Sequence, residues 1–134
     1  MKKIIFILMF VSLFLLACEY EDIHNFHLIY SVTSLTEEEV DIDITYKIGN
    51  EYITEQTQTP FIVEQDIELD KAKKENFYYY LELTKTSDKN ISIYVTSNGE
   101  YKTKIDNLQN SYLPLPVYTC GYIGFGLASV NINL

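Results

Sequence analysis

The chain has 134 residues, of which 19 are acidic and 10 are basic, giving a net charge of −9. It contains no arginine and has two histidines. Proteins that bind nucleic acids need a basic surface, so this composition excludes nucleic acid as a partner. The length corresponds to one domain.

The first segment has the composition of a secretory leader. Lys2 and Lys3 precede an apolar run over residues 4–16, and a small residue, Ala17, follows it. This order of a positive start, an apolar stretch and a small residue is typical of a signal peptide. The run has 13 residues, whereas a membrane-spanning helix needs about 20. We therefore expect residues 1–17 to be a cleaved signal peptide, which leaves 8 lysines against 19 acids in the mature chain.

The leader ends in Leu15, Leu16, Ala17 and Cys18, which resembles the lipobox of bacterial lipoproteins. In that class the cysteine thiol carries a thioether-linked diacylglycerol, and the free amine left by cleavage can take a further acyl chain. Two or more chains give stable anchoring. The resemblance implies export and lipid attachment at Cys18, with a plain secreted protein as the alternative.

Residues 18–25 are expected to form the lipidated N-terminus and a short acidic tether that begins at Glu19. An acidic protein gains nothing from an anionic lipid surface, so the lipid on Cys18 must supply the membrane attachment. Glu19 differs from the aspartate that typically retains lipoproteins in the inner membrane. An outer-membrane location in the cell envelope is therefore favoured.

Residues 26–134 alternate between apolar and polar side chains with period two, which predicts β-strands. The clearest strand runs from Val40 to Ile48, and hairpin turns are expected at Gly49-Asn50 and Asn98-Gly99. Further strands are expected over 51–57, 61–69, 77–84, 91–96 and 100–105, with a final strand or pair over 117–122 and 127–134. A polar loop or one helical turn is expected over 70–76, and a bend or bulge around Gly121, Gly124 and Gly126. We predict an all-β domain, a single immunoglobulin-like antiparallel β-sandwich of about seven strands.

The candidate chemical groups are few. In a strand His24 and His27 point to opposite faces, and no third ligand lies nearby, so no metal site is expected. Cys120 has no partner once Cys18 carries lipid, and we expect a small buried residue, with an intermolecular disulfide as the alternative. The acids of 37–39 are expected in a solvated loop. No nucleophile elbow or phosphate loop is present, so no catalytic residue, cofactor or enzyme activity is expected.

The chain has 12 tyrosines and no tryptophan. Three of them, Tyr78, Tyr79 and Tyr80, follow one another in a predicted strand. Sheet packing is the favoured interpretation, because aromatic residues suit half-buried pleated surfaces. The other interpretation is an exposed platform that stacks on a sugar or another extracellular molecule.

Five segments carry a resemblance to the mycobacterial small membrane protein family, MmpS. They read HLIYSVT (27–33), VDIDITYKIGNE (40–51), TPFIVEQDIEL (59–69), FYYYLELT (77–84) and ISIYVTSNGEYKTK (91–104). The resemblance implies an immunoglobulin-like sandwich outside the cytoplasmic membrane that assists transporters of the resistance-nodulation-division type. This chain lacks the family's paired cysteines and has lipid in place of a transmembrane anchor.

These observations predict a non-enzymatic, lipid-anchored envelope protein that serves as a binding or accessory subunit of an envelope transport or surface complex. An extracellular glycan-binding module that uses exposed tyrosines is the first alternative. An envelope hydrolase, which would need only two suitably placed carboxylates, is the second and less favoured one.

Overall fold

The computed structural model describes residues 21–36, 38–85, 89–108, 116–126 and 132–133. Within them it contains strands and no helix. The strands are β1 (Ile23–Ser34), β2 (Asp41–Ile48), β3 (Glu51–Gln58), β4 (Phe61–Asp70), β5 (Asn76–Lys85), β6 (Ile91–Ser97), β7 (Glu100–Leu108), β8 (Val117–Gly124) and β9 (Ile132–Asn133). The predicted all-β class is confirmed, although the described strands are nine rather than about seven.

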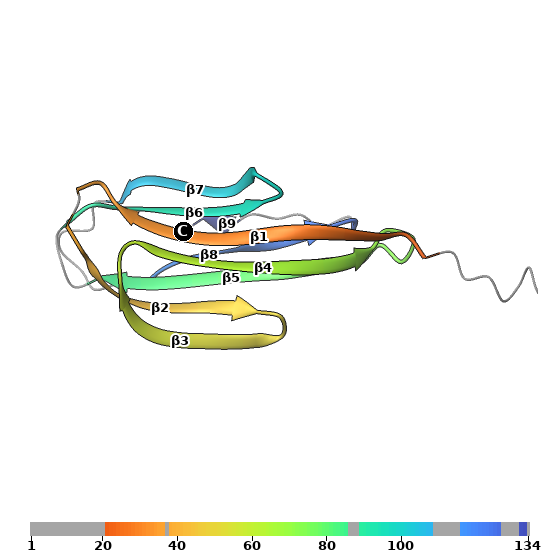
Figure 1. Cartoon of the computed structure of the whole chain (residues 1–134), viewed down its shortest axis with the longest axis horizontal. Coiled ribbons are helices and arrows are strands. Elements are labelled where there is room, and N and C mark those ends of the chain that lie inside the picture. Colours follow the sequence, from red (N-terminus) through yellow and green to blue (C-terminus); the bar gives the residue numbers. More distant parts are fainter. Residues whose placement is uncertain (1–20, 37, 86–88, 109–115, 127–131, 134) are drawn as a thin grey trace, which may run out of the picture.

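Two antiparallel sheets pack together as a sandwich (Figure 1). The first sheet has the order β4-β1-β6-β7, and the second has the order β3-β2-β5-β8-β9. The pairing of β1 with β4 and of β2 with β5 is that of strands B with E and C with F in immunoglobulin domains. The β6–β7 hairpin takes the place beside β1 that strand A fills in those domains.

Alternating side chains of both sheets build the core. On β1 the side chains of Leu28, Tyr30 and Val32 are fully buried, and Ile42 and Ile44 on β2 face them from the second sheet. Burying one such aliphatic side chain contributes about 1.5–3 kcal/mol. Because the side-chain period of a strand is two, this burial also fixes which residues point outward.

A polar cluster lies inside this core and joins the two sheets. The Tyr79 hydroxyl on β5 lies 3.3 Å from the Thr103 hydroxyl on β7, which lies 2.6 Å from the Thr119 hydroxyl on β8. All three residues are buried. Buried hydroxyls need such partners, because an unpaired one costs about 1–3 kcal/mol.

Both predicted hairpin turns are confirmed. Gly49 has a φ of +56°, and Asn98 and Gly99 have φ of +50° and +80°. Two successive positive φ values are characteristic of a type I′ turn, which Asn-Gly favours. The Asn98 side chain also accepts a hydrogen bond of 2.8 Å from the His27 backbone N–H, which fixes this turn to β1.

Three boundaries differ from those expected. β1 begins at Ile23, three residues before the predicted start of the domain, because its first residues pair with the end of β4. β8 continues through Gly121 to Gly124, so only Gly124 and Gly126 lie at the predicted bend. Of the expected last strand, Ile132–Asn133 is described, and residues 127–131 and 134 lie outside the described residues.

Candidate functional site

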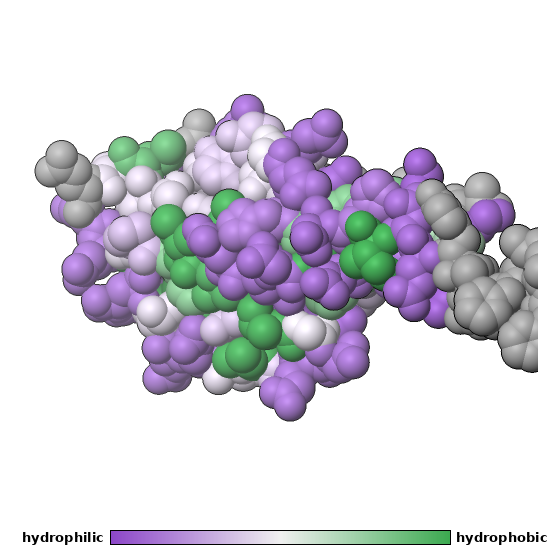
Figure 2. Space-filling model, turned by 45° about the vertical axis from the view of Figure 1, so that its right-hand side comes forward, coloured by the Kyte–Doolittle hydropathy of each residue, from purple (hydrophilic) through white to green (hydrophobic). Residues whose placement is uncertain are grey.

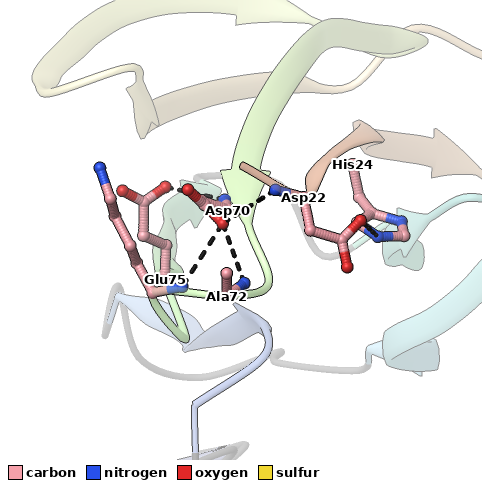
Figure 3. A network of polar contacts seen from close by, with 6 residues as sticks. Asp22, His24, Asp70, Ala72 and Glu75 are labelled. Atoms are coloured by element: carbon pink, nitrogen blue, oxygen red, sulfur yellow. Dashed lines mark hydrogen bonds and ion pairs between the residues drawn. The ribbon is translucent and has the colours of Figure 1, made fainter. Parts of the chain in front are cut away.

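The end of the sandwich that receives the chain from Cys18 is closed by Asp70, the last residue of β4. Cys18 and the leader lie outside the described residues. The Asp70 side chain is only 2% exposed, and its Oδ1 accepts hydrogen bonds from the backbone N–H groups of Ala72 at 2.9 Å and of Asp22 and Lys73 at 3.4 Å (Figure 3). A carboxylate that collects N–H donors is a strong acceptor. Asp70 therefore fastens the start of the domain to the β4–β5 turn.

Other bonds reinforce this end. The Lys71 backbone N–H donates to the Asp22 carbonyl at 2.8 Å, and Glu75 Oε2 accepts from the Asp70 N–H at 2.9 Å. The predicted polar loop over 70–76 is exposed from Lys71 onward, but Asp70 itself is buried. The β4–β5 turn is thus a fixed structural element at the point where the tether ends.

The two histidines point to opposite faces of β1, as predicted. His24 packs edge-on against Phe125, with 5.0 Å between ring centroids, and lies 2.8 Å from Asp22 Oδ1. His27 lies on the outer face, where its Nδ1 is 2.7 Å from Asp66 Oδ1. The hydrogen bond with Asp66 raises the pKa of His27 above its ordinary value. Among the residues that the structure describes, no group of three potential ligands could hold a metal ion.

The outer face of the second sheet gathers tyrosines from three strands. Cross-strand pairing places them on one side: β3 supplies one, β5 two and β8 two. We call this surface the tyrosine face; it comprises Tyr52, Tyr78, Tyr80, Tyr118 and Tyr122. Tyr52 is 56% exposed and Tyr122 is 39% exposed. The face therefore presents aromatic side chains to solvent, near the end of the sandwich that receives the tether.

Ring contacts hold the tyrosine face in place. Tyr52 packs edge-on against Tyr80 with 5.6 Å between centroids, and Tyr78 packs against Tyr122 at 5.1 Å. Such aromatic pairs contribute about 0.5–1.5 kcal/mol beyond their buried area. Of the three consecutive tyrosines Tyr79 belongs to the core, whereas Tyr78 and Tyr80 are half-buried on the outer face. Sheet packing is confirmed for Tyr79, and a stacking role of the other two stays a prediction.

Two phenols of this face, those of Tyr78 and Tyr80, stay neutral at physiological pH. Burial, followed by the hydrogen bond with Glu82, raises the pKa of Tyr80 to about 12. For Tyr78 the hydrogen bond with Cys120 is the largest cause of a raised pKa, and burial adds to it. These two residues thus offer uncharged rings and hydroxyls to a ligand.

The expectation that Cys120 is buried is wrong. Its side chain is only partly covered, and its pairing with Tyr80 places it on the outer face among the tyrosines. The physical reason is the register of β8, which turns Thr119, Gly121 and Ile123 inward. The described neighbours of the thiol are phenols, and both histidines lie on β1 in the other sheet.

A polar groove continues the same face away from the tyrosines. It has a volume of about 360 Å³ and is open to solvent. Its outward polar side chains come from β2, β3 and the end of β5: Asp41, Asp43, Gln56, Gln58 and Thr84. Gln58 Nε2 donates to Asp41 Oδ1 at 2.7 Å, which orders both side chains at the far end of the groove.

Sequence reasoning did not find this groove. The predicted strands over 40–48 and 51–57 include Asp41, Asp43 and Gln56, and Gln58 lies outside them. The alternation from Val40 to Ile48 together with the Gly49-Asn50 turn implies that outward residues of β2 and β3 share a face. The hollow also depends on where β5 ends beside them, which this local signal does not specify.

Large exposed hydrophobic side chains are scattered over the described surface. Ile23, Leu35 and Ile62 are 50%, 55% and 59% exposed and belong to β1, the loop after it and β4. In the view of Figure 2 the surface is mostly hydrophilic, with hydrophobic residues in separate small patches. Single exposed apolar residues are normal on soluble domains, so in that view no large apolar docking surface stands out.

The fold and the two surfaces define an antiparallel β-sandwich with an open, aromatic and polar sheet face. Comparison with protein-family models, with curated proteins and with solved structures finds no match to this chain. The resemblance to MmpS stays a prediction. Within the described ranges no helix is long and apolar enough to cross a membrane.

Proposed function

We propose that the protein is a lipid-anchored, non-enzymatic binding module of the bacterial cell envelope. In this proposal residues 1–17 are removed, lipid on Cys18 holds the chain to the outer membrane, and the tyrosine face binds another envelope component. An accessory role to a transporter, which the resemblance to MmpS implies, is one form of it.

The position of β1 supports an anchor that keeps the domain close to the membrane. β1 begins at Ile23, five residues after Cys18, and five residues span at most about 18 Å when fully extended. The backbone bonds of Asp22 fix the start of β1 to the β4–β5 turn. In this arrangement the end of the sandwich with the β4–β5 turn is next to the membrane, and the tyrosine face is on a lateral surface of the domain.

The exposed, ordered tyrosines carry the binding part of the proposal. Tyrosine combines a large apolar ring with a polar hydroxyl and loses little conformational entropy on binding, and it is enriched at binding surfaces. Tyr52 leaves more than half of its surface in solvent although its ring already contacts Tyr80. A rigid aromatic surface of this kind is suited to a partner and contributes little to the core.

The non-enzymatic part rests on the surroundings of the candidate groups. A cysteine nucleophile needs a base within hydrogen-bond reach, whereas the thiol of Cys120 shares a hydrogen bond with the Tyr78 phenol. His27 is engaged by Asp66 on the outer face of the other sheet. Neither histidine is therefore placed to act as a general base for this thiol.

The anchor is tested by the intact mass of the protein purified from membranes. We expect the mass of residues 18–134 plus acyl chains, and loss of membrane association in a Cys18→Ala variant. An unmodified mass, or membrane association that survives Cys18→Ala, would contradict lipid anchoring at this residue.

The binding face is tested by photocrosslinking in intact cells. A photoreactive aromatic residue in place of Tyr52 should form a high-mass adduct. The same residue in place of Tyr101 is the matched control, because Tyr101 is 59% exposed and contacts Tyr94 at 5.6 Å on the other sheet. Equal adducts from both positions, or none from position 52, would contradict the assignment of the tyrosine face.

A further inference from the structure

We infer that the outer face of the second sheet binds a neutral polysaccharide, which lies along β2 and β3 from the tyrosine face into the polar groove. This inference rests on the proposed binding function and names the ligand class. It joins two neighbouring surfaces that share one side of one sheet. From Tyr52 to Gln58 they extend over six residues of β3, about 20 Å, which is enough for several sugar units.

The groove has the hydrogen-bonding groups that sugar hydroxyls require. Carboxylates accept, whereas glutamine amides and threonine hydroxyls both donate and accept. Gln58 and Asp41 are already bonded to each other at 2.7 Å, so their geometry is set before a ligand arrives. Adjacent hydroxyls on a sugar ring can donate to Asp43 and exchange hydrogen bonds with Gln56 at the same time.

The tyrosine face supplies the complementary apolar contact. A pyranose ring has a face of C–H groups, and an aromatic ring such as that of Tyr52 offers a flat apolar surface with a polar hydroxyl at its edge. The phenols of Tyr78 and Tyr80 stay neutral, and the charges beside them, the Glu82 carboxylate and the Lys47 ammonium, are engaged by these two residues.

Charge restricts the ligand to a neutral polymer. Among the described residues no lysine lines the groove, and Asp41 and Asp43 make it negative. On the same face of β2 the Lys47 ammonium is bound to the Tyr78 carbonyl at 3.1 Å and lies over the Phe77 ring at 4.8 Å. A polyanion would therefore meet two carboxylates without a free cation to compensate them.

The shape and polarity of the groove favour a polymer over a small molecule or a protein. Small-molecule sites are mostly apolar and bury most of their ligand, whereas this groove is partly open and six of its seven lining residues are of polar types. Cores of protein interfaces are depleted in aspartate, because a buried carboxylate without a cation is costly. Hydroxyl groups satisfy Asp41 and Asp43 while leaving them partly hydrated.

The test uses the mature lipidated protein in detergent and affinity electrophoresis through gels that contain a soluble α-glucan, β-glucan or galactomannan, with polygalacturonate as the anionic comparison. We expect at least one neutral polymer to retard the protein, and polygalacturonate to leave it unretarded. Tyr52→Ala should weaken the apparent affinity about tenfold. Asp43→Ala should weaken it at least about tenfold.

Two matched variants control for nonspecific effects. Tyr101→Ala removes an equally exposed tyrosine from the other sheet, and Glu68→Ala removes an exposed acid from β4. Both should bind as the unsubstituted protein does, and all four variants should still unfold in one cooperative transition. Retardation that Tyr52→Ala and Asp43→Ala leave unchanged, or retardation by polygalacturonate alone, would overturn the inference.

The crosslinking experiment separates the two proposals. If no neutral polymer binds, but the adduct at position 52 forms and is degraded by protease, the ligand is a protein. In that outcome the ligand class is wrong and the proposed binding function stands. If neither retardation nor an adduct is found, both proposals fail.

Discussion

Removing the Asp70 carboxylate should destabilise the domain from the end that receives the tether. Its Oδ1 accepts one short and two long hydrogen bonds, from Ala72 at 2.9 Å and from Asp22 and Lys73 at 3.4 Å. A hydrogen bond to a charged group contributes about 1.5–3 kcal/mol. The two long bonds are weaker, and water can reach the freed donors, so we expect Asp70→Ala to cost about 3 kcal/mol in total.

The measurement is urea unfolding of the mature chain in a Cys18→Ala background, so that lipid does not interfere. With a slope of about 2 kcal/mol per molar urea, the midpoint should fall by about 1.5 M. Asp70→Asn keeps an acceptor oxygen and loses only the charge, so it should cost about 1 kcal/mol. Glu68→Ala, an exposed position on the same strand, should change stability by less than about 0.5 kcal/mol.

Hydrogen exchange locates the effect. The amides of Asp22 and of the first residues of β1 should exchange faster in Asp70→Ala than global unfolding explains. The amide of Val32 should change only by the amount that global unfolding explains. A midpoint for Asp70→Ala within about 0.2 M of the control, or uniform changes in exchange, would show that this carboxylate does not hold the chain entry.

Three further predictions concern other parts of the domain. Burial raises the pKa of Tyr30 above its ordinary value of 10.0, so the unfolded chain ionises first and stability should fall as the pH rises above 10, by up to about 1.4 kcal/mol per unit. A Tyr30→Phe variant should show a shallower fall in urea titrations at alkaline pH. Asp66→Asn should bring the pKa of His27 down toward 6.5 in an NMR titration of the imidazole, because the hydrogen bond with Asp66 is the main cause of the raised value. Gly124 has a φ of +129°, and a Cβ there would clash with the Glu75 carbonyl oxygen, so Gly124→Ala should lower stability by about 1–3 kcal/mol in thermal denaturation.

Local patterns predicted the parts of the fold that depend on neighbouring residues. The strict alternation from Val40 to Ile48 identified β2 and its buried side, since one face must meet the core. Asn98-Gly99 identified a hairpin because these residues accept positive φ values at low cost. The all-β class follows from such signals without knowledge of the spatial order of the strands.

Long-range pairing was beyond what the pattern could supply. β8 has apolar or small residues at both parities, so its sequence does not say whether Thr119 or Cys120 faces inward. Pairing with β5 decides this, and it joins residues about 40 positions apart. The groove depends in the same way on long-range pairing, because β5 ends beside Asp43. The pairing of β1 with β4 likewise explains why the first strand begins at Ile23, before the predicted start of the domain.

The place of β1 in the first sheet has a mechanical consequence. In the proposed lipid-anchored arrangement, a force between Cys18 and the second sheet would enter the domain at the start of β1. This strand is flanked on both sides, by β4 over Ile23 to Val32 and by β6 over Leu28 to Ser34. Traction along its axis would load both hydrogen-bond ladders in shear, where many bonds resist together, rather than peeling them one by one. The sandwich would therefore resist unfolding by a force applied at its N-terminal end.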